Sequence, residues 1–293
     1  MKRQPKGYRN LINVLSSAMS LVIIFSSCKK DDDAPAKEIS LSTNATLGSI
    51  LTDKTGRTLY MFANDATGAN SCTGGCEVLW PVFNVDNLTA DQLGTGLTRT
   101  DFTTITTASS KKQLVYKGRP LYYYAPVVGG VNTPEAAGQT TGEGFGNGVW
   151  YVAKPDYSVM LSNTQFVGHD GKNYTSAYVE GTGKTLYFTD PKGATLYAFS
   201  KDKQNTNTFT KADFSNNGTW PIYETDKIVV PSVLDKTLFG SITVFGKKQL
   251  TYKGWPLYFF GQDAGAPGIT KGVSFPTPGI WPAGRKDIAA ANP

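Results

Sequence analysis

The chain has 293 residues, of which 40% are hydrophobic, 12% aromatic and 18% charged, so it is long enough to bury a substantial core. Its 31 Gly, 16 Pro, 15 Tyr and 15 Phe favour strands and turns, and they argue against a coiled coil, a disordered chain or a polytopic membrane protein. The net charge of +6 includes four basic residues near the N-terminus. Without them 25 basic and 23 acidic residues remain, about +2, which is no electrostatic footprint for nucleic acid.

Residues 1–27 have the organisation of a secretory signal. Basic residues lie within positions 1–10, residues 11–25 are mostly apolar, and two serines precede Cys28. The apolar stretch is shorter than the roughly 20 residues that a membrane-spanning helix needs. Small residues directly before a cysteine resemble a bacterial lipobox, although Phe25 replaces the usual Leu. We therefore expect cleavage before Cys28 and lipidation of that cysteine, palmitate included. An ordinary cleaved signal is the alternative.

A polar tether follows the predicted lipidation site. Residues 28–38 contain no apolar side chain that is able to pack, which is typical of a flexible linker. The acidic run at 31–33 resembles a surface-export signal of some Gram-negative bacteria, and a merely hydrophilic tether is the alternative. The expected location is the bacterial outer membrane, with acylated Cys28 in the lipid bilayer and the protein exposed at the cell surface.

The rest of the chain is an internal duplication of about 136 residues. KKQLVYKGRPLYYY at 111–124 returns as KKQLTYKGWPLYFF at 247–260, with ten of fourteen positions identical. LTDKTGRTLYMFAND at 51–65 likewise returns as FTDPKGATLYAFSKD at 188–202. The predicted segments are a first half at 39–160, a second half at 161–288 and a C-terminal tail at 289–293.

Each half contains two related units, so the chain has four. Every unit carries the sequence Gly-x-x-Leu-Tyr, and a tryptophan follows its tyrosine 20 to 28 residues later. In chain order these pairs are Tyr60 and Trp80, Tyr122 and Trp150, Tyr197 and Trp220, and Tyr258 and Trp281. Short runs of β-branched and aromatic residues between turn residues predict about four antiparallel strands per unit. We expect an all-β protein whose four units form a propeller-like ring, or alternatively two packed β-domains.

The tyrosines belong to a longer motif, Tyr-x-aromatic-x-x-Asp. It is complete in three units, as Tyr60-Phe62-Asp65, Tyr197-Phe199-Asp202 and Tyr258-Phe260-Asp263. The second unit has Tyr122 and Tyr124 but Val127 where Asp should stand. Together with CTGGCEVLWPVF at 72–83, these motifs resemble the bacterial lipoproteins that carry a secreted repeat of unknown function, over about residues 45–285. The resemblance implies secretion, frequent lipidation and no established activity.

The recurring motif allows two interpretations. In a strand, the tyrosine and the aromatic residue two positions later share a face, so they can form the core of each unit while Asp caps the next turn. Alternatively, the aromatic rings form a repeated binding surface that stacks on sugar rings or similar ligands. A residue present in nearly every unit is more often structural than catalytic. Burial of the rings favours the first interpretation, and exposure favours the second.

Cys72 and Cys76 are the sharpest local feature. Outside the cytoplasm two cysteines in a glycine-containing loop usually form a disulfide. Redox activity or binding of a soft metal such as Cu(I), with Met61 as a conceivable third ligand, is the alternative. His169 is the only histidine, so a multi-histidine metal site is excluded and a Ser–His–Asp triad is disfavoured.

These observations favour a non-catalytic binding or scaffold role, with no cofactor, no metal and no assigned catalytic residue. The expected partner, besides the bilayer, is a glycan or another envelope protein. A redox or metal-handling envelope protein that uses Cys72 and Cys76 is one alternative. A carboxylate-dependent hydrolase is the other, and it requires a cleft with two carboxylates about 5 to 10 Å apart.

Overall fold

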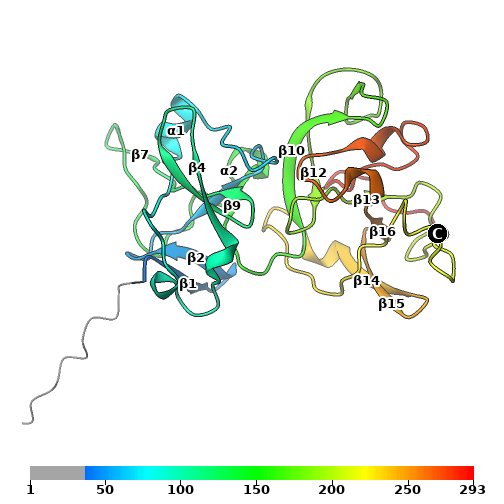
Figure 1. Ribbon diagram of the computed structural model, residues 1–293, viewed down its shortest axis with the longest axis horizontal. Helices are drawn as coiled ribbons and strands as arrows, with labels where there is room; N and C mark the ends of the chain where they lie inside the picture. The colour runs from blue at the N-terminus through cyan, green and yellow to red at the C-terminus, as the bar shows by residue number, and fades with distance from the viewer. Residues whose placement is uncertain (1–36) are drawn as a thin grey trace, which may run out of the picture. The chain divides into compact units, whose positions relative to one another are not determined.

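Short antiparallel strands joined by turns make up most of the regular structure. The computed structural model describes residues 37–293, and the predicted signal segment, Cys28 and the tether as far as residue 36 lie outside this range. The predicted all-β class is confirmed, with only short helical segments. Figure 1 shows strands β1 to β9 in the part coloured blue to green and β10 to β16 in the part coloured green to red.

Strands β1 to β9 lie in the first half. They are β1 (Ile39–Asn44), β2 (Gly48–Asp53), β3 (Tyr60–Phe62), β4 (Phe102–Thr106), β5 (Lys112–Tyr116), β6 (Arg119–Pro120), β7 (Val127–Val128), β8 (Val131–Asn132) and β9 (Trp150–Val152). The helical segments of this half are α1 (Gly75–Leu79), α2 (Phe145–Gly148) and the 3-10 turns η1 (Ala90–Gln92) and η2 (Arg99–Asp101). Of these, only η1 falls in a stretch whose sequence, LTADQL, predicts a helical turn.

The remaining strands belong to the second half, the first of them beginning at its boundary. They are β10 (Met160–Val167), β11 (Asn173–Tyr174), β12 (Lys184–Thr189), β13 (Tyr197–Ala198), β14 (Phe239–Val244), β15 (Lys247–Tyr252) and β16 (Trp255–Tyr258). The 3-10 turns are η3 (Lys236–Leu238), η4 (Gly261–Asp263) and η5 (Lys271–Ser274). The sequence PSVLDKTL predicts the first of these, where Asp235 accepts a hydrogen bond from the backbone N–H of Thr237.

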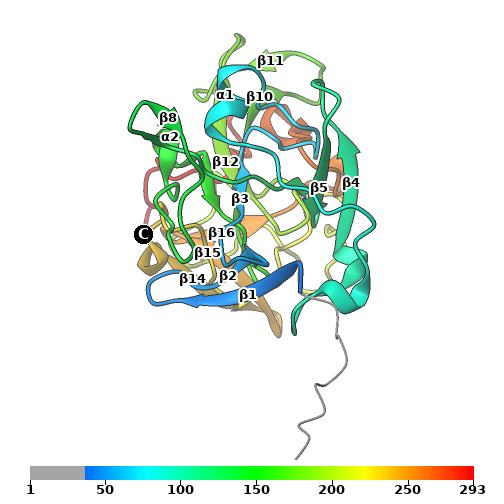
Figure 2. The same cartoon turned by 90° about the vertical axis from the view of Figure 1, so that its left-hand side faces the viewer.

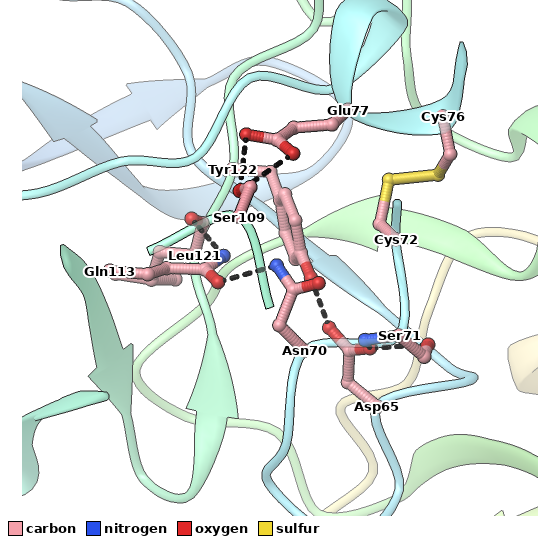
Figure 3. Close-up of a disulfide and its surroundings, with 10 residues drawn as sticks. All are labelled: Asp65, Asn70, Ser71, Cys72, Cys76, Glu77, Ser109, Gln113, Leu121 and Tyr122. Atoms are coloured by element: carbon pink, nitrogen blue, oxygen red, sulfur yellow. Dashed lines mark hydrogen bonds between the residues drawn. A yellow bond between two sulfur atoms is a disulfide. The ribbon is translucent and has the colours of Figure 1, made fainter. Parts of the chain in front are cut away.

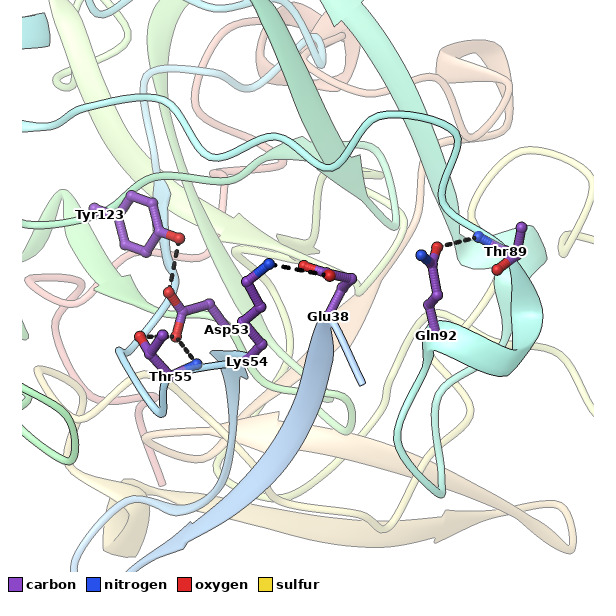
Figure 4. Close-up of polar contacts among 7 residues, drawn as sticks. All are labelled: Glu38, Asp53, Lys54, Thr55, Thr89, Gln92 and Tyr123. Atoms are coloured by element: carbon purple, nitrogen blue, oxygen red, sulfur yellow. Dashed lines mark hydrogen bonds and ion pairs between the residues drawn. The ribbon is translucent and has the colours of Figure 1, made fainter. Parts of the chain in front are cut away.

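Turn residues fix the hairpins. Lys117 and Gly118 both have positive φ, 48° and 79°, which is the two-residue turn whose twist suits a hairpin between β5 and β6. After β2, the Asp53 carboxylate accepts a hydrogen bond from the backbone N–H of Thr55 (Figure 4). It accepts another from the backbone N–H of Arg57. Gly56 completes that turn with a φ of +83°.

The beginning of the described chain is attached to the first half. The backbone N–H of Glu38 donates to the carbonyl of Gln92, and its carboxylate pairs with Lys54 at 3.2 Å (Figure 4). Gln92 also accepts a hydrogen bond from the N–H of Thr89, which is one arm of a capping box at η1. The polar residues at the end of the predicted tether therefore contact the fold.

The strands of the two units in each half alternate. In the first half, each of four strand segments pairs with the next, through Val82, Tyr122, Tyr60 and Val152 in that order. These residues come from the first, second, first and second unit. In the second half the corresponding order is Ile222, Tyr258, Tyr197 and Ala283. We call each of these arrangements a central ladder. Because the strands of two units interleave, the expected ring of four separate four-stranded blades is not what residues 37–293 show.

The halves share apolar core. One cluster contains Leu59 and Leu121 from the first half together with Leu196 and Leu257 from the second. Two buried polar contacts cross the same junction. The Arg119 guanidinium donates from Nη2 to the Ser162 hydroxyl at 2.7 Å, and the Tyr223 hydroxyl donates to the Ser158 carbonyl at 2.5 Å.

One hairpin projects from the first half without a counterpart in the second. Strands β7 and β8 form this hairpin, and both views show it at the edge of the ribbon (Figures 1 and 2). Val127, Val128 and Val131 are 62% to 66% exposed. The residue that stands in the place of the motif Asp in the second unit, Val127, therefore lies on an exposed hairpin.

Candidate functional site

The hydroxyl group of every motif tyrosine donates to a carboxylate of the other unit in its half. The pairs are Tyr60 with Glu135, Tyr122 with Asp65 at 2.5 Å, Tyr197 with Asp263 at 2.5 Å, and Tyr258 with Asp202 at 2.6 Å. The tyrosines are fully buried, and the aspartates are at most 4% exposed. The motif therefore joins two units.

The other oxygen of each carboxylate holds the loop that follows it. Asp65 accepts from the backbone N–H and hydroxyl of Ser71 at 2.8 and 2.6 Å (Figure 3). Asp202 binds Thr208 in the same way, and Glu135 binds Thr141. Asp263 accepts from the N–H of Lys271. In three of the four units, a Ser or Thr six residues after the carboxylate is thus the signal that identifies the acceptor.

Glu135 supplies the carboxylate that the second unit lacks at Val127. The β7–β8 hairpin separates it from Tyr124, and the hydroxyl of Tyr60 and the loop residue Thr141 are its partners. Its longer side chain makes the same two contacts as an Asp in the other units. Sequence comparison missed it because both its type and its spacing from the tyrosine differ.

Burial determines the protonation of this network. Desolvation, with the neighbouring carboxylate as a second cause, raises the pKa of Tyr122 and of Tyr258, so both hydroxyls remain donors. Burial also raises the pKa of Asp65, although the hydrogen bonds from Ser71 and Tyr122 oppose it. The pKa of Asp263 is raised to about 7, again mainly by burial. All four carboxylates already accept hydrogen bonds from the protein.

The aromatic residues of the motif and the tryptophans form one stack in each half. In the first half, the rings of Trp80 and Trp150 lie parallel at 3.8 Å, flanked by Phe62 and Tyr124. The second half repeats this order as Phe199, Trp281, Trp220 and Phe260, with 3.7 Å between the two tryptophans. All but Phe199 are buried. The burial favours the structural interpretation, and these rings do not provide the exposed stacking surface that was the alternative.

Two glycines pack directly against the aromatic rings, and the sequence alone did not indicate them. A Cβ atom on Gly142 would lie 2.7 Å from Trp80 Cη2, and one on Gly272 would lie 2.7 Å from the Tyr197 ring. The backbone N–H groups of both glycines donate to a motif tyrosine hydroxyl. Glycine is required here because the backbone approaches the rings too closely for any side chain.

The predicted disulfide is present between Cys72 and Cys76, with 5.2 Å between their Cα atoms (Figure 3). It closes the loop that leads from Ser71 into α1, and Cys72 is buried against the aromatic stack of the first half. Met61, the conceivable third metal ligand, belongs to a different core cluster. His169 lies in an exposed turn. Among the described residues, no group of three or more His, Cys, Asp or Glu side chains is arranged to hold a metal ion.

A cleft of about 360 Å³ lies at the junction of the two halves. Its walls are joined by Glu143, whose carboxylate accepts hydrogen bonds from the hydroxyl of Ser232 and the backbone N–H of Val152, both at 2.6 Å. Lys154 and Lys236 line the cleft, and neither forms an ion pair within residues 37–293. Burial lowers the pKa of Lys154.

The fold and these contacts define an all-β, internally duplicated protein. Residues 42–84 and 243–283 each match the family model described as a secreted repeat of unknown function. The family resemblance that the motifs predicted is confirmed, and the chain carries this secreted repeat twice. No curated protein and no solved structure matches the chain. In the part of the chain that the structure describes, no helix is long and apolar enough to cross a bilayer.

Proposed function

We propose that the chain is a lipid-anchored, non-catalytic binding protein of the bacterial cell envelope. Its N-terminal signal, the predicted lipidation at Cys28 and the secreted family support this location. Outer-membrane attachment and display at the cell surface are part of the proposal.

The proposed binding site follows from one observation: the polar side chains that recur from unit to unit are already engaged in contacts within the protein. Each motif tyrosine hydroxyl and each acceptor carboxylate is buried in a contact between units. A ligand must therefore use residues that do not recur, and the cleft between the halves contains such residues. Sites at the junction of two domains or repeats are common places for small ligands, and the cleft volume suits one.

The cleft suits a ligand rich in hydroxyl groups, such as a short segment of envelope glycan. Lys154 and Lys236 offer donors, Asp156 offers an acceptor, and Tyr157 lines the same wall. Hydrogen bonds between Ser158 and Val229 and between Glu143 and Ser232 hold the two walls. A preformed cleft loses less conformational freedom on binding than a flexible one.

Binding is tested with glycan fragments released from the envelope of the producing cells. The affinity of the purified protein is measured by calorimetry, and Lys154→Met should weaken it at least tenfold. Lys248→Met is the matched control because Lys248 is exposed on β15, outside the cleft. No binding, or equal binding by both variants, would contradict the proposed site. Cleaved fragments in the titration would contradict a non-catalytic role.

The location and the thiol state are tested by intact mass. A chain that begins at Cys28 and carries a diacyl or triacyl increment would support the anchor, whereas an unmodified chain would make the protein an ordinary secreted one. Protease added to intact cells should digest a surface-displayed protein. Cysteines that react with a thiol label before reduction, or bound metal, would favour the redox or metal-handling alternative.

A further inference from the structure

The two halves provide an internal comparison at the turn after β2 and β12. Asp53 in the first half and Asp190 in the second occupy the same place in the duplication. One oxygen of Asp53 accepts from the N–H groups two and four residues later, at 2.8 and 2.9 Å. One oxygen of Asp190 makes the same two contacts, at 2.9 and 2.8 Å. The turn is therefore the same in both halves.

The second carboxylate oxygen has a hydrogen-bond donor in the first half but not in the second. Asp53 Oδ2 accepts a hydrogen bond from the Tyr123 hydroxyl at 2.8 Å (Figure 4). In the second half the position of Tyr123 is occupied by Phe259, which has no hydroxyl. Within residues 37–293, no group donates to Asp190 Oδ2.

Each half has a corresponding pair of aromatic rings, and in the second half the hydroxyl is carried by the other member of the pair. Phe83 and Tyr123 pack edge to face in the first half, and Tyr223 and Phe259 do so in the second. The Tyr223 hydroxyl donates to the Ser158 carbonyl at the junction of the halves. The exchange therefore strengthens the junction and leaves the carboxylate of the turn without its donor.

The pKa values of the two carboxyl groups shift in opposite directions, and the missing Tyr123 hydroxyl is one cause of this beside the Thr55 hydroxyl, whose place in the second half is taken by Lys192. Burial acts to raise the pKa of Asp53, but hydrogen bonds from Arg57, Thr55 and Tyr123 together hold it below its ordinary value. Burial raises the pKa of Asp190, and only backbone hydrogen bonds and Lys192 oppose it. The Asp190 carboxylate thus has the weaker set of partners of the two.

A pocket of about 290 Å³ opens beside Asp190. Its apolar lining includes the rings of Phe259, Phe260 and Pro221. Three charged side chains face it: Asp190, Asp263 and Lys192. Asp263 already accepts from Tyr197 and from the N–H of Lys271, and the exposed Lys192 makes no ion pair with Asp190. Asp190 Oδ2 is the acceptor that remains for a ligand.

We propose that this pocket binds a small organic ammonium ion whose nitrogen donates to Asp190 Oδ2, in place of the Tyr123 hydroxyl of the first half. The apolar body of the ion packs against Phe259, Phe260 and Pro221. Opposite charge supplies the attraction to Asp190, and a hydrogen bond to an ionised acceptor is stronger than a neutral one. This site shares no residue with the cleft between the halves.

Benzylammonium is the probe, and its affinity for the purified protein is measured by calorimetry at pH 7.5. Phe259→Tyr is the decisive variant because it supplies the donor that the first half already has, without disturbing the turn. It should weaken binding at least tenfold, and Asp190→Asn should do the same. Phe245→Tyr is the control because Phe245 is exposed in the turn between β14 and β15, and its affinity should equal that of the wild type.

Two further probes of the same shape test the ligand class. Benzyl alcohol retains a donor without the charge and should bind at least tenfold more weakly than benzylammonium, and benzoate should not bind. The proposal is overturned if the wild type does not bind benzylammonium at millimolar concentration, if benzyl alcohol or benzoate binds equally well, or if Phe259→Tyr leaves the affinity unchanged. Denaturant unfolding verifies that the Phe259→Tyr protein is folded, and the midpoint of its transition should move to higher denaturant concentration.

Discussion

Replacing Tyr122 by Phe tests whether the contact between units stabilises the fold. The change removes only the hydroxyl that donates to Asp65 Oδ2 at 2.5 Å and leaves the ring in place. Asp65 is 1% exposed, so water has little access to the oxygen that loses its donor. A hydrogen bond to a charged group contributes about 1.5 to 3 kcal/mol, and leaving a buried charged acceptor unsatisfied lies at the upper end of that range. We expect a loss of about 2 to 3 kcal/mol in the free energy of unfolding.

The assay is urea unfolding of the disulfide-intact protein at pH 7.5, followed by the fluorescence of the stacked tryptophans. Tyr124→Phe is the matched control. It removes a hydroxyl that has no hydrogen-bond partner within residues 37–293, and Phe260 occupies the same place in the second half. We expect this control to change the free energy by less than about 0.5 kcal/mol. In thermal unfolding, the Tyr122 variant should melt roughly 5 to 10 °C lower.

Equal stability of the two variants would refute the argument, because the ring is retained in both. A second readout uses pH. Loss of the Tyr122 donor raises the pKa of Asp65 further, since this hydrogen bond opposes the effect of burial. The penalty should therefore be smaller at pH 5, where Asp65 takes up a proton more readily, than at pH 8. A penalty that grows on acidification would also contradict the assignment.

Three other changes have definite expected outcomes. Gly142→Ala places a Cβ atom 2.7 Å from Trp80 Cη2 and should lower the free energy of unfolding by about 1 to 3 kcal/mol in urea titration, whereas Gly75→Ala, which meets no atom within 4 Å, should not. Replacing both cysteines of the disulfide by alanine should cost about 2 kcal/mol because the loop is short, and an unchanged denaturation midpoint would contradict this. The pKa of Asp263 is about 7 in the folded protein and near 4 when unfolded, so the folded state binds the proton more tightly. The free energy of unfolding should therefore fall by up to about 4 kcal/mol from this residue as pH rises from about 4 to about 7, and Asp263→Asn should remove that part of the pH dependence.

Local features of the fold were predictable from local sequence. The turn at Asp53 and Gly56 and the two-residue hairpin at Lys117 and Gly118 follow from residue types that fix backbone conformation over a few positions. The disulfide between Cys72 and Cys76 follows from spacing and compartment. Each of these depends on residues that are neighbours in the chain.

The interleaving of units was not predictable in the same way. Four copies of one motif have equivalent pairing partners in sequence, and only long-range geometry decides that Tyr60 pairs with Tyr122. Glu135 was missed because a hairpin insertion changes its distance from Tyr124, so the spacing pattern fails. The sequence shows Phe259 in the place of Tyr123, but only the structure shows that the Tyr123 hydroxyl donates to Asp53 and that Asp190 lacks this donor beside a pocket.

The exchange of partners between units bears on how such chains lengthen during evolution. Tyr60 and Tyr122 form a reciprocal pair of backbone hydrogen bonds, at 2.9 and 3.0 Å, and each needs a carboxylate from the opposite unit. A chain with an odd number of units would leave one buried tyrosine and one buried carboxylate without partners. Duplication is therefore tolerated in steps of two units. A solitary unit would have to recruit a second copy of itself to satisfy the same contacts, as in a symmetric homodimer.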